Sequence, residues 1–284
     1  MARFNAFEKI KSLNPEKDYW EIIRLSALYE FTWDYARSLE LALFRTFASP
    51  SISAILAKTR EFEKRTQKRY DDTDLILSEI LENGIDNERG RKALEKMNFI
   101  HSHFNISNTD YLYVLSTFIF VPERWINKYG YRKLCHNETQ AGYKLWQEVG
   151  LAMGIKNIPE KREELELFFD EYEKKNFVLN KNNKAIATYT ENLLLGWFLP
   201  RRLYFIGRPF VHAIMDHQLL NAIGSGKPNW LIQNTVDVAF GVRKQIVKIL
   251  PRRQNPVLRT TLVRKKSYPS GYKVEELGSL PPPR

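Results

Sequence analysis

The sequence predicts an all-α protein made of a single large helical domain. Apolar residues recur at intervals of three and four through most of the 284-residue chain, as they do on the buried face of an amphipathic helix. Only 13 glycines are spread over that length and 43% of the residues are apolar, which argues against disorder and against a turn-rich β fold. A chain of this size is close to the upper limit for one hydrophobic core.

We expect this helical domain to occupy residues 1–250, followed by an extended, basic tail at 251–284. The tail is rich in arginine, lysine and proline and lacks helical periodicity. We expect it to lie over the surface, with a frayed end at Pro281-Pro282-Pro283.

The elements of the domain can be placed in order from periodicity and capping residues. A long helix, or two abutting ones, is predicted over residues 15–47, and Ser49-Pro50 starts the next helix. Ser107 begins a capping box, and the apolar helix that follows should be central to the core until Pro122 turns the chain. Further helices are expected at residues 138–153, 160–177, 183–198, 211–223 and 229–250, with a break at Gly207-Arg208-Pro209.

Residues 65–104 contain a basic, polar run followed by two predicted helices. The first helix, residues 74–82, is stopped by Asn83-Gly84, and the second covers residues 87–104. If Asp71 or Asp72 caps the first helix, then Arg69 and Thr73 lie beside its N-terminus, where backbone N–H groups favour an anion or an oxygen ligand. The alternative is an ordinary N-cap with a surface arginine.

The charge balance favours anionic partners without naming one. The formal net charge is +11, but the chain has no long block of Lys and Arg and no known nucleic-acid motif. We therefore expect no specific nucleic acid partner. A contact with an anionic membrane surface stays open.

The single cysteine, Cys135, excludes an intramolecular disulfide and any site that needs several thiolates. The N-terminal residues alternate in polarity and form no signal peptide, and no apolar run is long enough to span a bilayer. The sequence therefore predicts a cytoplasmic protein, with peripheral membrane contact as an open alternative.

One of the five histidines has a distinctive setting. His101 follows the apolar pair Phe99-Ile100 in a predicted helix, which suggests that this face of the helix is buried. A buried histidine must be satisfied by a hydrogen bond, a charge or a metal, and a hydrogen-bonded core histidine is the commonest case. His103 points to another side of the helix, so only one of the two can face the core.

Several stretches around these residues resemble the ER-bound oxygenase MpaB and rubber oxygenase (latex clearing protein) family. The resemblance covers roughly residues 15–200. It is carried by the stretches Tyr29–Asp34, Leu41–Phe47, Lys68–Thr73, Met97–His101, Asn108–Leu115 and Trp125–Tyr131.

The resemblance implies a globin-like helical core around a non-covalently bound haem b. It implies an oxygenase that uses dioxygen to oxidise or cleave a hydrophobic, unsaturated substrate of isoprenoid or lipid-like character. In the family, a histidine after an apolar pair ligates the iron; His101 matches this position and His103 is the alternative. An Arg-x-x-x-Thr element lines the distal side of the haem, and Arg69 and Thr73 match its spacing.

The resemblance leaves two roles open for Arg69. With Thr73 it could donate hydrogen bonds to an oxygen-containing group, or it could pair with a haem propionate. The rubber branch has a basic residue directly before the threonine, where this chain has Asp72, and that branch is secreted. Polyisoprene is therefore not the expected substrate.

The apolar residues near His101 have two interpretations: they line a substrate-binding pocket, or they belong to the hydrophobic core. Phe99, Ile100, Tyr111, Leu115 and Phe118 could line such a pocket. The alternative function is a non-enzymatic, basic helical protein that binds an anionic membrane surface or nucleic acid and holds no cofactor.

Overall fold

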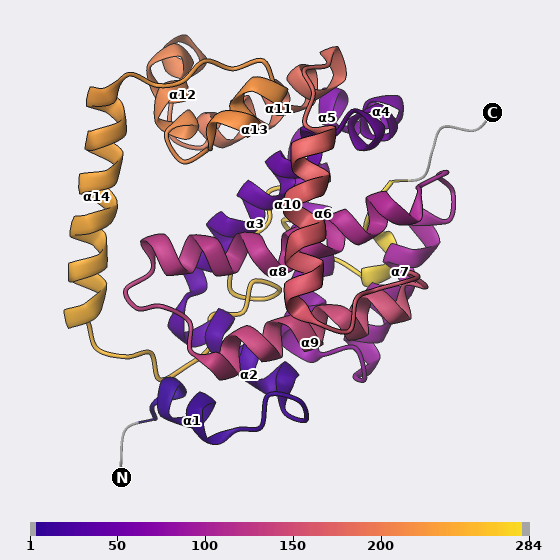
Figure 1. The fold of residues 1–284 in the computed structure, drawn as a ribbon, viewed down its shortest axis with the longest axis vertical. Coiled ribbons are helices and arrows are strands. Elements are labelled where there is room, and N and C mark those ends of the chain that lie inside the picture. The colour runs from indigo at the N-terminus through magenta and orange to yellow at the C-terminus, as the bar shows by residue number, and fades with distance from the viewer. Residues whose placement is uncertain (1–3, 280–284) are drawn as a thin grey trace.

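The computed structural model describes residues 4–279, and every regular element in this range is a helix (Figure 1). The first half contains α1 (Ala6–Ser12), α2 (Tyr19–Leu25), the π-helical turn η1 (Ser26–Glu30), α3 (Thr32–Phe47), α4 (Pro50–Thr59), α5 (Glu61–Lys64), α6 (Thr66–Asn83) and α7 (Glu88–His101). The second half contains α8 (Asn108–Tyr129), α9 (His136–Ala152), α10 (Arg162–Asn176), α11 (Lys181–Gly196), η2 (Arg201–Leu203), α12 (Tyr204–His212), α13 (His217–Ala222), α14 (Trp230–Ile249) and η3 (Val274–Glu276). The predicted all-α class and single helical domain are confirmed.

Helix α8 runs through the middle of the molecule and packs against α3, α9 and α10 (Figure 1). The predicted cap is present, because the Ser107 hydroxyl accepts a hydrogen bond from the Asp110 N–H at 3.0 Å. The predicted turn at Pro122 is wrong, since α8 continues to Tyr129 with this proline inside it. Proline costs one helical hydrogen bond, but Trp125 and Ile126 beyond it are buried in the core, and that burial favours continuing the helix.

The structure also decides two other boundaries. Of the two alternatives predicted for residues 15–47, the structure has the abutting helices, with the π-helical turn Ser26–Glu30 between α2 and α3. Gly207-Arg208-Pro209 does not break the chain, because α12 includes all three residues and ends at His212. Single-residue propensity therefore does not set the boundary of α12.

Helix α6 is also longer than predicted. It starts at Thr66, so Asp71 and Asp72 lie inside the helix and do not cap it. Arg69 and Thr73 are therefore one turn apart on the same face, away from the helix N-terminus. The proposed anion site at a helix N-terminus is wrong for these two residues.

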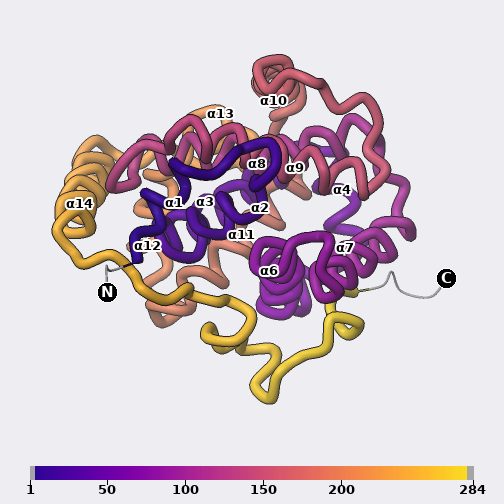
Figure 2. The backbone as a smooth tube through the Cα atoms, turned by 90° about the horizontal axis from the view of Figure 1, so that it is seen from below, coloured from indigo at the N-terminus to yellow at the C-terminus, as the bar shows by residue number. Residues whose placement is uncertain are grey.

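The segment after α14 crosses the molecule without forming a long helix. Figure 2 shows it leaving α14, passing beneath α6 and ending beside α7. Its only regular element within the described residues is the short η3 turn, which packs on α7. Val274 and Leu277 are buried there, so this part of the segment predicted to lie over the surface is packed into the molecule. The end predicted to be frayed, Pro281-Pro282-Pro283, lies outside the described residues.

Within residues 4–279, no single helix is both long enough and apolar enough to cross a bilayer. Helices α3 and α4 meet that test only when they are taken together, and they are bent by 99° where they meet.

Candidate active site

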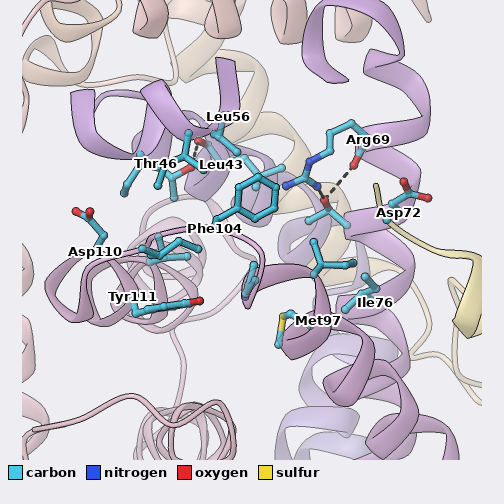
Figure 3. Close-up of a pocket in the computed structure, with 18 of the residues that line it drawn as sticks. Leu43, Thr46, Leu56, Arg69, Asp72, Ile76, Met97, Phe104, Asp110 and Tyr111 are labelled. Carbon is cyan, nitrogen blue, oxygen red and sulfur yellow. Dashed lines mark hydrogen bonds between the residues drawn. The ribbon is translucent and has the colours of Figure 1, made fainter. Parts of the chain in front are cut away.

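A cavity of about 220 Å³ lies between α4, α6, α7 and α8 (Figure 3). Most of its walls are aliphatic or aromatic. The exceptions are a few polar side chains, among which are Arg69, Asp72 and Thr73 of α6, His101 of α7, and Asp110 and Tyr111 of α8. A mostly apolar cavity with a few converging polar groups is the usual form of a small-molecule site.

His101 lies on the cavity wall at the last position of α7. Its Nδ1 atom is buried and has no hydrogen-bond partner among the described residues. The ring stands edge-on to Tyr111, with 5.6 Å between ring centroids. Burial, together with the nearby charge of Arg69, lowers the pKa of His101 to about 4. The imidazole is therefore neutral at physiological pH, with a nitrogen lone pair available to a ligand.

His103 is in a different environment. It is exposed, and its Nδ1 atom lies 2.7 Å from the Phe99 carbonyl oxygen, to which it can donate a hydrogen bond. Its ring contacts the ring of Phe99 on the outside of the helix end. The structure therefore places His101 in the cavity and His103 at the surface.

The Arg69 side chain reaches from α6 toward the middle of the cavity (Figure 3). Its guanidinium donates to the Thr73 hydroxyl oxygen and stacks over the Phe62 ring, 5.4 Å from the centroid. It forms no ion pair with any carboxylate of the described residues. Burial lowers the pKa of Arg69, although an arginine remains charged at any pH of interest. The cavity thus contains a cation with unused N–H donors.

The Thr73 hydroxyl uses both its donor and its acceptor on Arg69. Its hydroxyl donates to the Arg69 carbonyl oxygen at 3.0 Å, one turn back along α6, while the oxygen accepts from the guanidinium. Both contacts fix the direction in which Arg69 points. The sequence therefore named three residues, Arg69, Thr73 and His101, that the fold brings to one cavity.

The expected apolar lining is largely present. Ile100, Tyr111, Leu115 and Phe118 all line the cavity. Phe99 does not, because it is half exposed at the surface beside His103. The apolar pair before His101 therefore does not mark one buried face, since consecutive helical residues point about 100° apart.

Sequence reasoning missed the part of the wall that comes from the C-terminal segment. Gly278 and Ser279 line the cavity, and the fully buried Leu277 lies next to them. A Cβ atom on Gly278 would lie 2.2 Å from Ile100 Cδ1, and its φ of +81° also favours glycine. No local sequence signal could reveal this contact, because about 180 residues separate its partners.

Helix α6 fixes the segment that supplies this wall. The Lys68 ammonium donates to both Asp72 carboxylate oxygens at 2.8 and 3.0 Å, and to the Tyr268 hydroxyl at 2.9 Å. The Tyr268 hydroxyl in turn donates to Asp72. Asp72, the residue that departs from the rubber branch, therefore has its charge compensated by Lys68 and anchors the C-terminal segment.

Comparison with known proteins identifies the family. The sequence profile of the ER-bound oxygenase mpaB/B'/rubber oxygenase catalytic domain matches residues 36–228. The chain belongs to this family. It is 31% identical over 224 residues to ER-bound oxygenase mpaB' of Penicillium brevicompactum, a match that covers 72% of this chain and 53% of that protein. It is 30% identical over 226 residues to ER-bound oxygenase mpaB of Penicillium roqueforti, covering 73% of this chain and 76% of that protein.

The family's catalytic-domain match includes Arg69, Thr73 and His101 but ends before the C-terminal wall of the cavity. The chain spans about half the length of the P. brevicompactum relative that it matches. Gly278 and Ser279 are thus features of this chain that membership of the family does not by itself predict.

The cavity has the donors that a haem needs from a protein. A haem requires only one protein ligand to its iron, so the finding that residues 4–279 contain no cluster of three or more metal-ligating side chains does not bear on it. His101 provides a neutral imidazole with an unpartnered nitrogen, and Arg69 provides an unpaired cation for a carboxylate. The apolar lining suits the macrocycle. In the chemistry of their side chains, these residues therefore fit the group that the resemblance implies.

Proposed function

We propose that this chain is a haem b-dependent oxygenase that oxidises or cleaves a hydrophobic, unsaturated substrate with dioxygen. The observation that supports this most is His101, a neutral imidazole without a hydrogen-bond partner on the wall of an apolar cavity. A buried nitrogen of this kind costs free energy unless a ligand compensates for it. Membership of an oxygenase family specifies the class of chemistry.

His101 is the residue that would ligate the iron. Its pKa of about 4 means that no proton has to leave the ring before it binds a metal at neutral pH. Its position at the end of α7, packed on Tyr111, limits the rotation of the imidazole. When bound, haem iron supplies the site at which dioxygen is taken up and made reactive.

Arg69 would bind an anionic or oxygen-rich group within the cavity. A haem propionate and an oxygenated substrate group both offer acceptors that would compensate for its charge. Thr73 acts through Arg69, because its hydroxyl proton is already donated to a backbone carbonyl. We therefore propose that Thr73 is a positioning residue for Arg69, and that Arg69 makes the contact.

The substrate that suits this cavity is apolar over most of its length. Ile100, Leu115 and Phe118 offer no hydrogen bonds, so a polar molecule would lose its hydration without compensation. The same walls exclude water from the reacting groups. We propose an isoprenoid or lipid-like molecule that is small enough for this cavity, in place of polyisoprene.

Haemin titration of the purified protein tests the proposal. The wild-type chain should bind haem at one equivalent and develop a Soret band. His101→Ala should lose this binding while its far-UV circular dichroism keeps the helical signal, because the imidazole is removed and most of the core is not. Thr73→Val should retain the haem and shift the spectrum, and Thr73→Ser should restore the wild-type spectrum.

His103→Ala is the matched control, since it removes an imidazole two residues away at the surface. It should bind haem as the wild type does. If His103→Ala loses the haem and His101→Ala retains it, the ligand assignment is wrong. A wild-type protein that stays colourless with excess haemin contradicts the proposed cofactor and favours the non-enzymatic alternative.

A further inference from the structure

Helix α14 stands at one edge of the molecule, on the side away from α7, which contributes His101 to the cavity wall (Figure 1). One of its faces packs on the body. Phe240 contacts the rings of Trp33, Trp125 and Tyr129, with centroid distances of 6.0, 5.6 and 4.2 Å. Arg243 pairs with the buried carboxylate of Asp34 at 2.8 and 3.0 Å. The helix is therefore held firmly by this inner face.

The opposite face of α14 is also apolar. It carries an exposed stripe of Leu231, Val238, Val242 and Ile249, whose side chains are 59%, 65%, 54% and 83% exposed. These residues are spaced seven, four and seven positions apart, so at 100° per residue they lie within about 20° of one line. The stripe is about 27 Å long. Exposed Trp230 lies at its start, and Leu250 follows its end.

A solvent-facing apolar stripe of this length needs an occupant. Single exposed apolar residues are ordinary, but an aligned series on a rigid helix marks a binding face. In a helix whose other side already packs on the body, this second stripe adds nothing to the core. The described residues offer no segment that covers it.

The charges beside the stripe indicate what covers it. Lys248 lies on the flank of α14, about 100° around the helix from the stripe, and Arg252 and Arg253 follow directly after the helix. None of these three cations forms an ion pair within residues 4–279, although Arg252 stacks over the Tyr131 ring, 4.3 Å from the centroid. Asp237 is the only carboxylate of α14. An apolar stripe with flanking cations and a terminal tryptophan is the pattern of a helix that lies in a lipid interface.

The same charges disfavour a second copy of the chain as the occupant. A two-fold interface places the same face of both copies together, so the cations of one helix would approach those of the other. With a net charge of +11, two copies also repel each other over longer distances. An anionic lipid surface compensates for these cations and buries the stripe at the same time.

We propose that the outer face of α14 binds to anionic lipid surfaces, with the helix lying flat in the headgroup region. The inner contacts of Phe240 and Arg243 keep the helix on the body, so it binds along the surface and does not insert across the bilayer. This attachment is separate from the cavity and holds whether or not the cavity binds haem.

Vesicle flotation with the full-length chain tests the proposal. Vesicles of phosphatidylcholine and phosphatidylserine in equal parts should carry the protein, and vesicles of phosphatidylcholine alone should carry much less. Val238→Asp combined with Val242→Asp should lower binding about tenfold or more, because charged groups replace the centre of the stripe. Lys248→Glu with Arg253→Glu should weaken binding to the anionic vesicles and reduce its sensitivity to salt.

Leu151→Asp combined with Leu167→Asp is the matched control, because these leucines are comparably exposed on α9 and α10. It should bind as the wild type does, and circular dichroism should confirm that every variant is folded. Equal binding by the α14 and control variants would overturn the proposal, as would no binding to anionic vesicles at low salt. A lipid-free dimer that the α14 substitutions dissociate would assign the face to a second copy instead.

Discussion

Helix α6 has two sides that differ in how their charged groups are paired. On the side that faces the C-terminal segment, every carboxylate has partners. Asp74 forms ion pairs with Arg259 and Lys265. Glu79 accepts hydrogen bonds from the Arg89 guanidinium and from the Tyr272 hydroxyl. Glu82 accepts hydrogen bonds from the backbone N–H groups of Arg259 and Thr260. On the cavity side, Arg69 has only a hydroxyl partner, and His101 of the adjacent helix has none for its buried nitrogen.

This difference separates groups that stabilise the fold from groups that await a ligand. A buried pair with complete hydrogen bonding holds distant segments together, and here it holds the C-terminal segment on α6. A buried cation or nitrogen without a partner costs stability, and such groups persist where a bound molecule compensates for them. By their contacts alone, and independently of the family resemblance, Arg69 and His101 are therefore the groups of this kind beside the cavity.

The largest effect on stability is expected from Asp74→Asn, on the side of α6 that faces the C-terminal segment. Although burial raises the pKa of Asp74, Arg259 and Lys265 hold it below its usual value, so the carboxylate is charged in the folded protein. Its loss leaves the buried Lys265 without its counter-charge. The free energy of unfolding should fall by about 3–5 kcal/mol in urea denaturation.

Asp170→Asn is the matched control for this change, because Asp170 pairs with Arg124 at the exposed surface. It should cost less than about 1 kcal/mol. Equal losses in the two variants would show that burial of the α6 pairs does not matter.

On the cavity side, His101 should make the apo protein sensitive to acid. Its pKa is about 4 when folded, below the usual 6.5, so the unfolded chain takes up the proton first as the pH falls. Stability is therefore complete above about pH 6.5 and declines toward pH 4, by about 3 kcal/mol at most. His101→Gln should flatten this part of a plot of unfolding free energy against pH.

Glu40 provides a control of opposite sign in the same pH range. Burial raises the pKa of Glu40 to about 7, so this group makes the fold lose stability as the pH rises from 4.5 to 7. Glu40→Gln should remove that loss. The unfolding free energy should then rise more steeply with pH, because the contribution of His101 is no longer opposed. A dependence that His101→Gln leaves unchanged would assign the acid sensitivity to other groups.

Gly278→Ala tests the part of the cavity wall that comes from the C-terminal segment. The added Cβ atom would overlap Ile100 Cδ1, and the positive φ disfavours alanine as well. A loss of about 1–3 kcal/mol in thermal unfolding is expected. Combining it with Ile100→Val, which removes that Cδ1 atom, should recover part of the loss. A double variant no more stable than Gly278→Ala alone would mean that backbone strain accounts for the whole effect.

The smallest effect on stability is expected from Arg69→Met. The substitution removes a buried cation without a carboxylate partner, so the apo protein should stay within about 1 kcal/mol of the wild type or become slightly more stable. Haem affinity or the haem spectrum should nevertheless change. A loss of unfolding free energy as large as that of Asp74→Asn would show that Arg69 stabilises the fold, as the paired carboxylates on the other side of α6 do.

Much of the fold and part of the site follow from the sequence alone. The helical periods, the Ser107 cap and the absence of strand signals predict an all-α domain, because these patterns act over a few neighbouring residues. The family resemblance named Arg69, Thr73 and His101, and their spacing on two consecutive helices made one shared cavity plausible.

Only the tertiary structure decided which of these local signals would prevail. Pro122 lies inside α8, and Asp72 lies inside α6, because burial over a whole helix outweighs the preference of one residue. The cavity wall at Gly278 and the outer stripe of α14 are likewise results of packing. Whether a residue is buried or exposed depends on chain segments that are far apart in sequence, and no local pattern contains that information.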